Sequence, residues 1–147
     1  MPHKYWKKED EKAVKLARSY PELCTVAKRV LGRIGEDVCF VCGPITTGGA
    51  GSVKKNIVVL KRRITLLRKE GKNVFDQMAF EKALWRIEKL VRGSEKDLLN
   101  GFYRPLFELG KIKTFYFVFG WETSYGAQWE YNQARRLGIR TVFLGKL

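Results

Sequence analysis

The stretch Thr114-Phe-Tyr-Phe-Val-Phe119, followed by Gly120-Trp-Glu-Thr-Ser-Tyr-Gly-Ala-Gln-Trp-Glu130, decides the fold. Six strand-favouring residues end at a glycine, and a short polar loop then leads into a helix predicted over 126–137. A strand, a tight loop and a helix N-terminus together build the ligand crevice of an α/β protein. We therefore expect a ligand-binding edge of a sheet here.

Glu130 falls at an unusual position in this predicted helix. The periodicity places four residues against the sheet, at i, i+4, i+7 and i+10: Ala127, Tyr131, Ala134 and Leu137. Glu130 lies three after Ala127 and four before Ala134, so it shares their inward face. An inward carboxylate at the mouth of a sheet is a candidate site residue. Two other interpretations stay open: the helix dipole alone favours acids in the first turns, and Glu130 can pair with Arg135 or another base.

Length and composition indicate one folded domain. The chain has 147 residues, of which 45% are hydrophobic. Its apolar runs fall far short of the roughly 20 residues that a membrane span needs. The charged N-terminus is not followed by an apolar segment, so it does not have the pattern of a secretory signal. We expect a cytoplasmic protein with no membrane partner.

The cysteines and the histidine do not suggest a metal or redox centre. Three cysteines are an odd number, which argues against a disulfide framework. Cys39 and Cys42 form a C-x-x-C motif, but positions three apart on a strand point to opposite faces. His3 is the only histidine, so zinc sites lack their usual residues. We expect neither a metal nor a cofactor.

The rest of the chain alternates between strand and helix patterns. Residues 38–42 read as a buried parallel strand, 73–76 as a short strand and 140–144 as a final strand. Helical patterns cover 53–70, most of 77–109, and two segments of 8–33 that Pro21 divides. This order predicts an α/β fold: a flavodoxin-like, Rossmann-like three-layer sandwich with four to five mostly parallel strands. We expect residues 1–36 to form an N-terminal helical extension and residues 37–147 the α/β domain.

A glycine-rich loop follows the strand 38–42. In flavodoxin-like order this strand lies beside 114–119, so the loops 43–52 and 120–126 should face each other across one crevice. Gly48, Gly49 and Gly51 allow the backbone to approach a phosphate or sugar closely. The loop is neither a P-loop nor a full dinucleotide fingerprint, and a flexible surface connection is the alternative interpretation.

Two motifs of this chain resemble a known family. Phe40-Val-Cys-Gly-Pro-Ile45 and Gly120-Trp-Glu-Thr-Ser-Tyr-Gly-Ala-Gln-Trp-Glu130 are similar to motifs of the nucleoside 2-deoxyribosyltransferase superfamily, chiefly those of its uncharacterised bacterial and phage branch. The 2′-deoxynucleoside 5′-phosphate N-hydrolases are similar at both places. The resemblance covers roughly residues 38–144.

The resemblance implies a function and a set of site residues. Glu130 matches the catalytic glutamate, which attacks C1′ of the sugar and forms a glycosyl-enzyme. Ser124 and Gly126 match the part that holds a 5′-phosphate or 5′-hydroxyl, and Gly43, Pro44 and Ile45 match the loop that contacts sugar and base. The predicted substrate site also includes Gly48, Gly49, Trp121 and Ala127. Because family members commonly form dimers or larger oligomers, we expect a homodimer or higher homo-oligomer.

The chain departs from the family pattern at the second acid. Active members carry an aspartate before the third main strand, whereas the segment 104–114 contains none. Asp97 and Glu108 are the candidate substitutes. Trp121 and Glu122 also replace residues that are smaller or polar in the active branches.

Three functions follow from these observations. The leading hypothesis is a nucleoside- or nucleotide-binding protein that cleaves or transfers an N-glycosidic bond of a (deoxy)nucleoside or its 5′-monophosphate. The first alternative is an inactive nucleotide-sensing module, which the missing aspartate motivates. The second is a basic nucleic-acid-binding protein, which is motivated by the net charge of +14 and by basic residues along one face of helix 53–70, namely Lys54, Lys55, Lys61, Arg62, Arg68 and Lys69.

Overall fold

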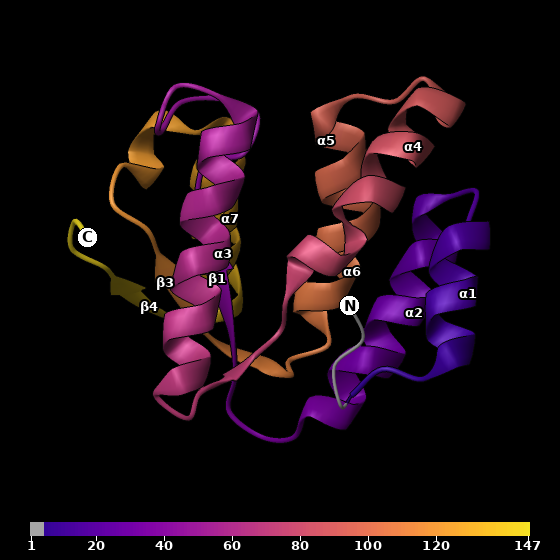
Figure 1. Cartoon of the computed structure of the whole chain (residues 1–147), viewed down its shortest axis with the longest axis horizontal. Helices are drawn as coiled ribbons and strands as arrows, with labels where there is room; N and C mark the ends of the chain where they lie inside the picture. Colours follow the sequence, from indigo (N-terminus) through magenta and orange to yellow (C-terminus); the bar gives the residue numbers. More distant parts are fainter. Residues whose placement is uncertain (1–4) are drawn as a thin grey trace. The chain divides into compact units, whose positions relative to one another are not determined.

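The computed structural model describes residues 5–147, which divide into two compact units. The α/β unit comprises Glu36–Asp76 and Gly110–Leu147, and the helical unit comprises the residues up to Gly35 together with Gln77–Leu109. The chain therefore leaves the α/β unit after β2 and returns to it at β3 (Figure 1). The segment 77–109, which the sequence predicts to be part of the α/β domain, clusters with the N-terminal helices instead.

The α/β unit is built on a four-stranded parallel sheet. Its strands are β1 (Val38–Cys42), β2 (Asn73–Val74), β3 (Ile112–Phe117) and β4 (Arg140–Phe143), in the order β2-β1-β3-β4. This is the order of a flavodoxin-like sheet, with the reversal of strand addition between β1 and β3. All five residues of β1 are buried, as its continuous apolar sequence predicts. The predicted strand 114–119 is shifted, because β3 ends at Phe117 and Phe119 is 63% exposed.

Two helices cover the two faces of this sheet. α3 (Val53–Lys69) packs on β1 and β2, and α7 (Tyr125–Leu137) packs on β4. The faces are distinguished by consecutive residues at the ends of the strands. The Phe117 ring lies on the face covered by α7, with its centroid 5.9 Å from that of Tyr131. Val118, the next residue, lies on the face covered by α3, where it and Leu60 of that helix both lie against Gly43. Figure 1 accordingly shows α3 in front of β1 and α7 behind it. These three layers confirm the predicted architecture.

The helical unit contains α1 (Lys8–Leu16), α2 (Tyr20–Ile34) and the helical segment between β2 and β3. That segment comprises a 3-10 turn η1 (Gln77–Phe80), α4 (Glu81–Val91), α5 (Glu95–Leu98), a π-helical turn η2 (Leu99–Tyr103) and α6 (Arg104–Glu108). Pro21 occupies the first turn of α2, as predicted. A chain of aromatic contacts runs through the core, from Trp6 to Phe80 at 5.2 Å and from Phe80 to Phe102 at 5.5 Å.

A buried carboxylate joins α1 to α2. Asp10 is fully buried and pairs with Arg33 at 2.5 Å and with Arg29 at 3.5 Å. It also accepts a hydrogen bond from the amide of Lys7 at 2.9 Å. Although burial acts to raise it, these hydrogen bonds hold the pKa of Asp10 below its ordinary value.

Candidate functional site

The loops that follow β1 and β3 are hydrogen-bonded to each other. The amide of Gly49 donates to the hydroxyl of Thr123 at 2.8 Å, and the amide of Tyr125 donates to the hydroxyl of Thr47 at 3.1 Å. Both loops lie at the carboxyl ends of neighbouring strands, where the strand order reverses. The prediction that these loops face each other is confirmed.

Asn56, in the first turns of α3, organises the glycine-rich loop. Its side chain is buried and donates to the carbonyls of Ile45 at 3.0 Å and Gly48 at 3.1 Å. Its carbonyl oxygen accepts from the amide of Ala50 at 2.8 Å. Three hydrogen bonds from one side chain fix the course of the loop, so the loop is not a free surface connection.

Two of the loop glycines are required by close packing. Gly49 has φ +70°, and a Cβ there would lie 2.5 Å from the Asn56 carbonyl oxygen and 2.7 Å from Pro44. Gly48 has φ +66°, and a Cβ there would overlap Thr123. By contrast, a Cβ on Gly51 at φ +100° would meet nothing within 4 Å. The close packing of the loop therefore explains glycine at positions 48 and 49 without reference to a ligand.

A hollow of about 310 Å³ opens beside these contacts, at the N-terminus of α3. Ser52 caps this helix by accepting from the amide of Lys55 at 3.2 Å, and the first turn of α3 contains no acid. A 17-residue helix presents free amides and the positive end of its dipole at this point, which favours an anionic group. The hollow is lined by Thr46, Gly48, Gly49, Gly51, Ser52, Asn56 and Thr123.

Glu130 points inward from α7, as its spacing predicts. It is 8% exposed, beside the fully buried Ala127 and Ala134 on the same face. Its carboxylate accepts a hydrogen bond from the thiol of Cys42, the last residue of β1. Burial raises the pKa of the Cys42 thiol well above its ordinary value, and the charge and hydrogen bond of Glu130 raise it further. Glu130 therefore lies at the carboxyl end of the central strand pair.

The structure separates the remaining predicted substrate residues into several environments. Gly43 and Pro44 are buried at the end of β1, and Ile45 is half-buried. Ser124 is buried and caps α7 by accepting from the amide of Ala127 at 3.2 Å, while Gly126 is half-buried in the first turn. Gly48 and Gly49 line the hollow, whereas Glu130 does not.

Trp121 belongs to an aromatic cluster. Its ring centroid lies 5.0 Å from that of Phe117, 5.1 Å from that of Tyr131 and 5.6 Å from that of Phe143. The cluster packs the turn after β3 against β4 and α7. This packing gives Trp121 a structural role within the α/β unit.

Neither candidate second acid belongs to the α/β unit. Asp97 accepts from the amide of Ser94 at 2.9 Å and forms the capping box of α5. Glu108 pairs with Arg104 one turn earlier at 3.3 Å. Within residues 5–147, no group of three histidine, cysteine or acidic side chains is arranged to hold a metal. His3 lies outside the described residues.

The sequence did not predict four residues that take part in this site: Cys42, Thr47, Asn56 and Thr123. A signal for Asn56 was available, since it lies three after Val53 and four before Leu60 on the inward stripe of α3. The two threonines carry no such pattern. The alternation along β1 places the side chain of Cys42 on the same face of the sheet as that of Phe40. It does not show which helix covers that face.

Comparison with known proteins finds no matching family model, no similar curated protein and no similar solved structure. The resemblance to nucleoside 2-deoxyribosyltransferases therefore rests on the two sequence motifs alone. In the part of the chain that the structure describes, no helix combines the length and apolar content needed to cross a membrane.

Proposed function

We propose that the α/β unit binds a nucleoside or its 5′-monophosphate at the carboxyl edge of the sheet, and that Glu130 cleaves the N-glycosidic bond. The observation that carries this proposal is the position of Glu130. It is a buried carboxylate on the inward face of α7, hydrogen-bonded to the last residue of β1. This is the edge at which α/β proteins bind ligands.

The chemistry suits a buried carboxylate. Glu130 attacks C1′ as the C1′–N bond breaks, and the bonding pair leaves with the base, which takes up a proton. The resulting glycosyl ester is then cleaved by water, or by a second base in a transfer reaction. A carboxylate also stabilises the positive charge that develops on the sugar in the transition state.

The hollow at the N-terminus of α3 supports a phosphate-bearing substrate. The positive end of the α3 dipole favours an anion there, and the volume of about 310 Å³ is at the lower end of the usual range for ligand pockets. We therefore expect 5′-monophosphates to bind more tightly than the corresponding nucleosides.

A second candidate function is nucleotide binding without cleavage. Asp97 and Glu108, the two acids considered for protonating the base, are engaged in a helix cap and in an ion pair. If no other group protonates the leaving base, the site retains affinity and loses turnover.

The test uses the full chain and a panel of ribo- and deoxyribonucleosides with their 5′-monophosphates. Binding is measured by calorimetry and free base by chromatography. Release of base from at least one compound supports the leading proposal. Saturable binding with no release supports the second candidate. If no member of the panel binds, both candidate functions are overturned.

A further inference from the structure

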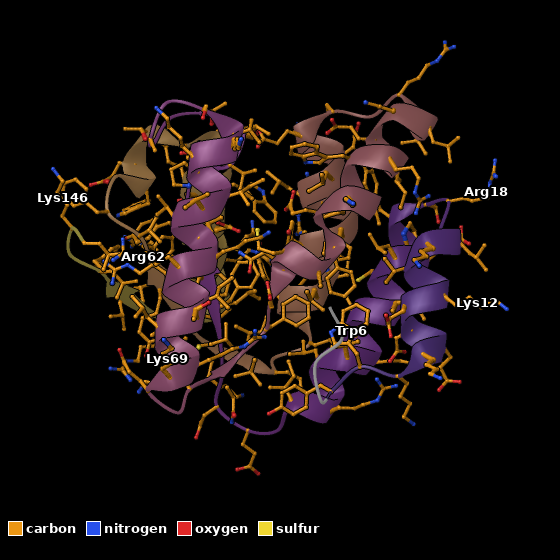
Figure 2. The ribbon with its side chains drawn as sticks, viewed as in Figure 1. Trp6, Lys12, Arg18, Arg62, Lys69 and Lys146 are labelled. Carbon is orange, nitrogen blue, oxygen red and sulfur yellow. The ribbon has the colours of Figure 1, made fainter. Side chains whose placement is uncertain are left out.

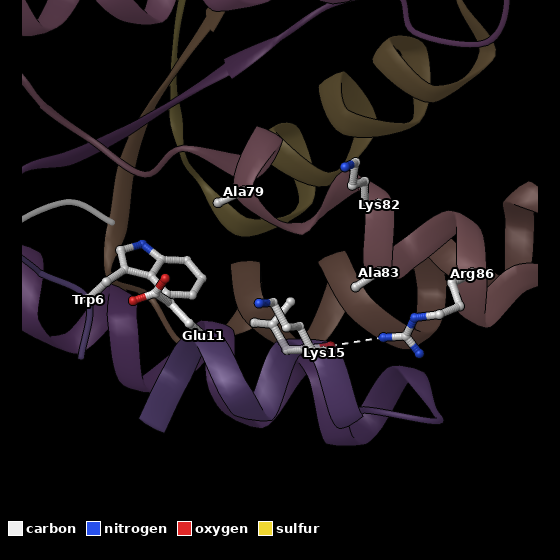
Figure 3. Close-up of a pocket in the computed structure, with 8 residues that line it drawn as sticks. Trp6, Glu11, Lys15, Ala79, Lys82, Ala83 and Arg86 are labelled. Atoms are coloured by element: carbon white, nitrogen blue, oxygen red, sulfur yellow. Dashed lines mark hydrogen bonds between the residues drawn. The ribbon is translucent and has the colours of Figure 1, made fainter. Parts of the chain in front are cut away.

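The helical unit has a groove between α1 and α4 that is separate from the proposed nucleotide site. Two adjoining hollows of about 600 and 770 Å³ form it, and they share Lys15, Lys82 and Arg86. In Figure 3, Lys15 and Glu11 line it from α1, and Ala83 and Arg86 line it from α4. Both walls belong to one compact unit.

The lining of this groove is strongly cationic. Among the described residues that line it, Glu11 is the one acid, whereas the basic side chains, all exposed, are Lys15, Arg18, Lys82, Arg86 and Lys89. Arg86 is fixed in place, because its guanidinium donates to the carbonyl of Ala17 at 2.7 Å and to that of Val14 at 2.9 Å. Such a concentration of positive charge attracts a polyanion.

An exposed aromatic ring lies among these charges. Trp85 lines the larger hollow and is 40% exposed. It lies between Lys82 and Lys89 on α4, and its indole N–H donates to Glu81 one turn earlier, which restricts the ring. Leu16 and Leu90 add exposed apolar surface at 64% and 49% exposure.

We propose that this groove binds single-stranded nucleic acid. Its cations contact successive phosphates, and an unpaired base stacks on Trp85. Basic grooves that carry exposed aromatic rings bind single strands in this way, because every base offers a flat face for stacking. The exposed basic face of α3, which includes Lys54, Lys61 and Arg62, lacks an accompanying aromatic ring in the same helix. Figure 2 shows Arg62 on that face.

The test measures binding of fluorescein-labelled dT20 to the full chain by anisotropy, from 50 to 300 mM KCl. Five phosphate contacts predict a slope of about −3.5 for the logarithm of the association constant against that of salt. The variant Lys15→Gln/Lys82→Gln/Lys89→Gln should bind at least about tenfold more weakly at 50 mM KCl, with a slope shallower by about 2. The matched control Lys54→Gln/Lys61→Gln/Arg62→Gln removes the same charge from α3 and should stay within about twofold of wild type.

A second pair of variants tests stacking. Trp85→Ala should weaken dT20 binding at least about fivefold, while Trp85→Phe should retain more of the affinity. Circular dichroism and thermal melting confirm that each variant is folded. A nucleoside 5′-monophosphate of the panel should not displace dT20, so this inference and the proposed nucleotide site fail separately.

Three results would overturn the proposal. Equal losses in the two triple variants would mean that net charge alone drives binding. A duplex of the same length that binds as tightly as dT20 would exclude stacking on Trp85. Polyglutamate that displaces dT20 at equal charge concentration would indicate an acidic protein as the partner.

Discussion

The thiol of Cys42, at the carboxyl end of β1, donates a hydrogen bond to the carboxylate of Glu130 on α7. Both groups are buried, and they lie beside the point where the strand order reverses between β1 and β3. A thiol is a weak donor, so it orients the carboxylate without binding it as strongly as a basic side chain would. This arrangement suits the role of nucleophile that we propose for Glu130.

The cysteines should be unreactive in the folded protein. All three are free and buried, and burial raises the pKa of Cys24, Cys39 and Cys42, that of Cys39 to about 11. Because the thiolate is the reactive form, Ellman's reagent at pH 8 should detect almost no thiol until denaturant is added, and then all three. Rapid reaction of any cysteine in the native protein would show that these strands and helices open readily.

The packing of the glycine-rich loop indicates that two similar substitutions should lower the free energy of unfolding by different amounts. Gly49→Ala and Gly51→Ala both place a side chain on left-handed backbone, which costs roughly 1 kcal/mol. Gly49→Ala also forces Asn56 and Pro44 to move, so it should lower the free energy of unfolding by about 2 kcal/mol more. Urea denaturation measures the difference. Equal effects would mean that the contacts with Asn56 do not hold the loop.

The ion pair of Asp10 predicts a loss of stability in acid. Because its pKa is lowered in the folded state, Asp10 stabilises the fold above its ordinary pKa of 3.8, and this contribution is lost as the pH falls below that value. Asp10→Asn should lower the free energy of unfolding at pH 7 by about 3 kcal/mol and remove this acid dependence. In the control Glu108→Gln, an exposed pair is broken and the change should stay within about 0.5 kcal/mol.

Glu81 predicts the opposite dependence on pH. Burial raises its pKa to about 7, its hydrogen bond from Trp85 acts against this rise, and the charge of Glu88 adds to it. The folded state therefore binds more protons than the unfolded state between pH 4.5 and about 7, so stability should decline as the pH rises through this window. Thermal melting of Glu81→Gln should show no such decline, whereas the exposed Glu9→Gln should keep it. A decline that persists in Glu81→Gln would assign it to another group.

Much of the α/β unit was predictable because its signals are local. The apolar run 38–42, the stripe of helix 53–70 and the strand–loop–helix at 114–137 fix the elements, and the preference for parallel alternation fixes their arrangement. The inward position of Glu130 followed from spacing alone. The spacing did not indicate which side chain it meets across the layer.

The less predictable features depend on contacts between distant residues. The periodicity of 77–109 shows that its helices have apolar faces, and it does not show that these faces pack with α2. In the same way, the sequence does not show whether a glycine allows a ligand or another residue to approach the backbone closely. At Gly48, the residue that approaches is Thr123. The packing of the Trp121 ring against Phe117, Tyr131 and Phe143 likewise depends on contacts that the spacing does not indicate.

The rate of base release by Glu130→Gln tests the central claim most directly. With the best substrate of the nucleotide panel, this variant should lose roughly 10³-fold or more of the turnover while its affinity changes by a few-fold at most. Glu122→Gln removes the same charge from an exposed position in the neighbouring loop and should retain the wild-type rate. A rate for Glu130→Gln within tenfold of wild type would show that Glu130 is not the nucleophile.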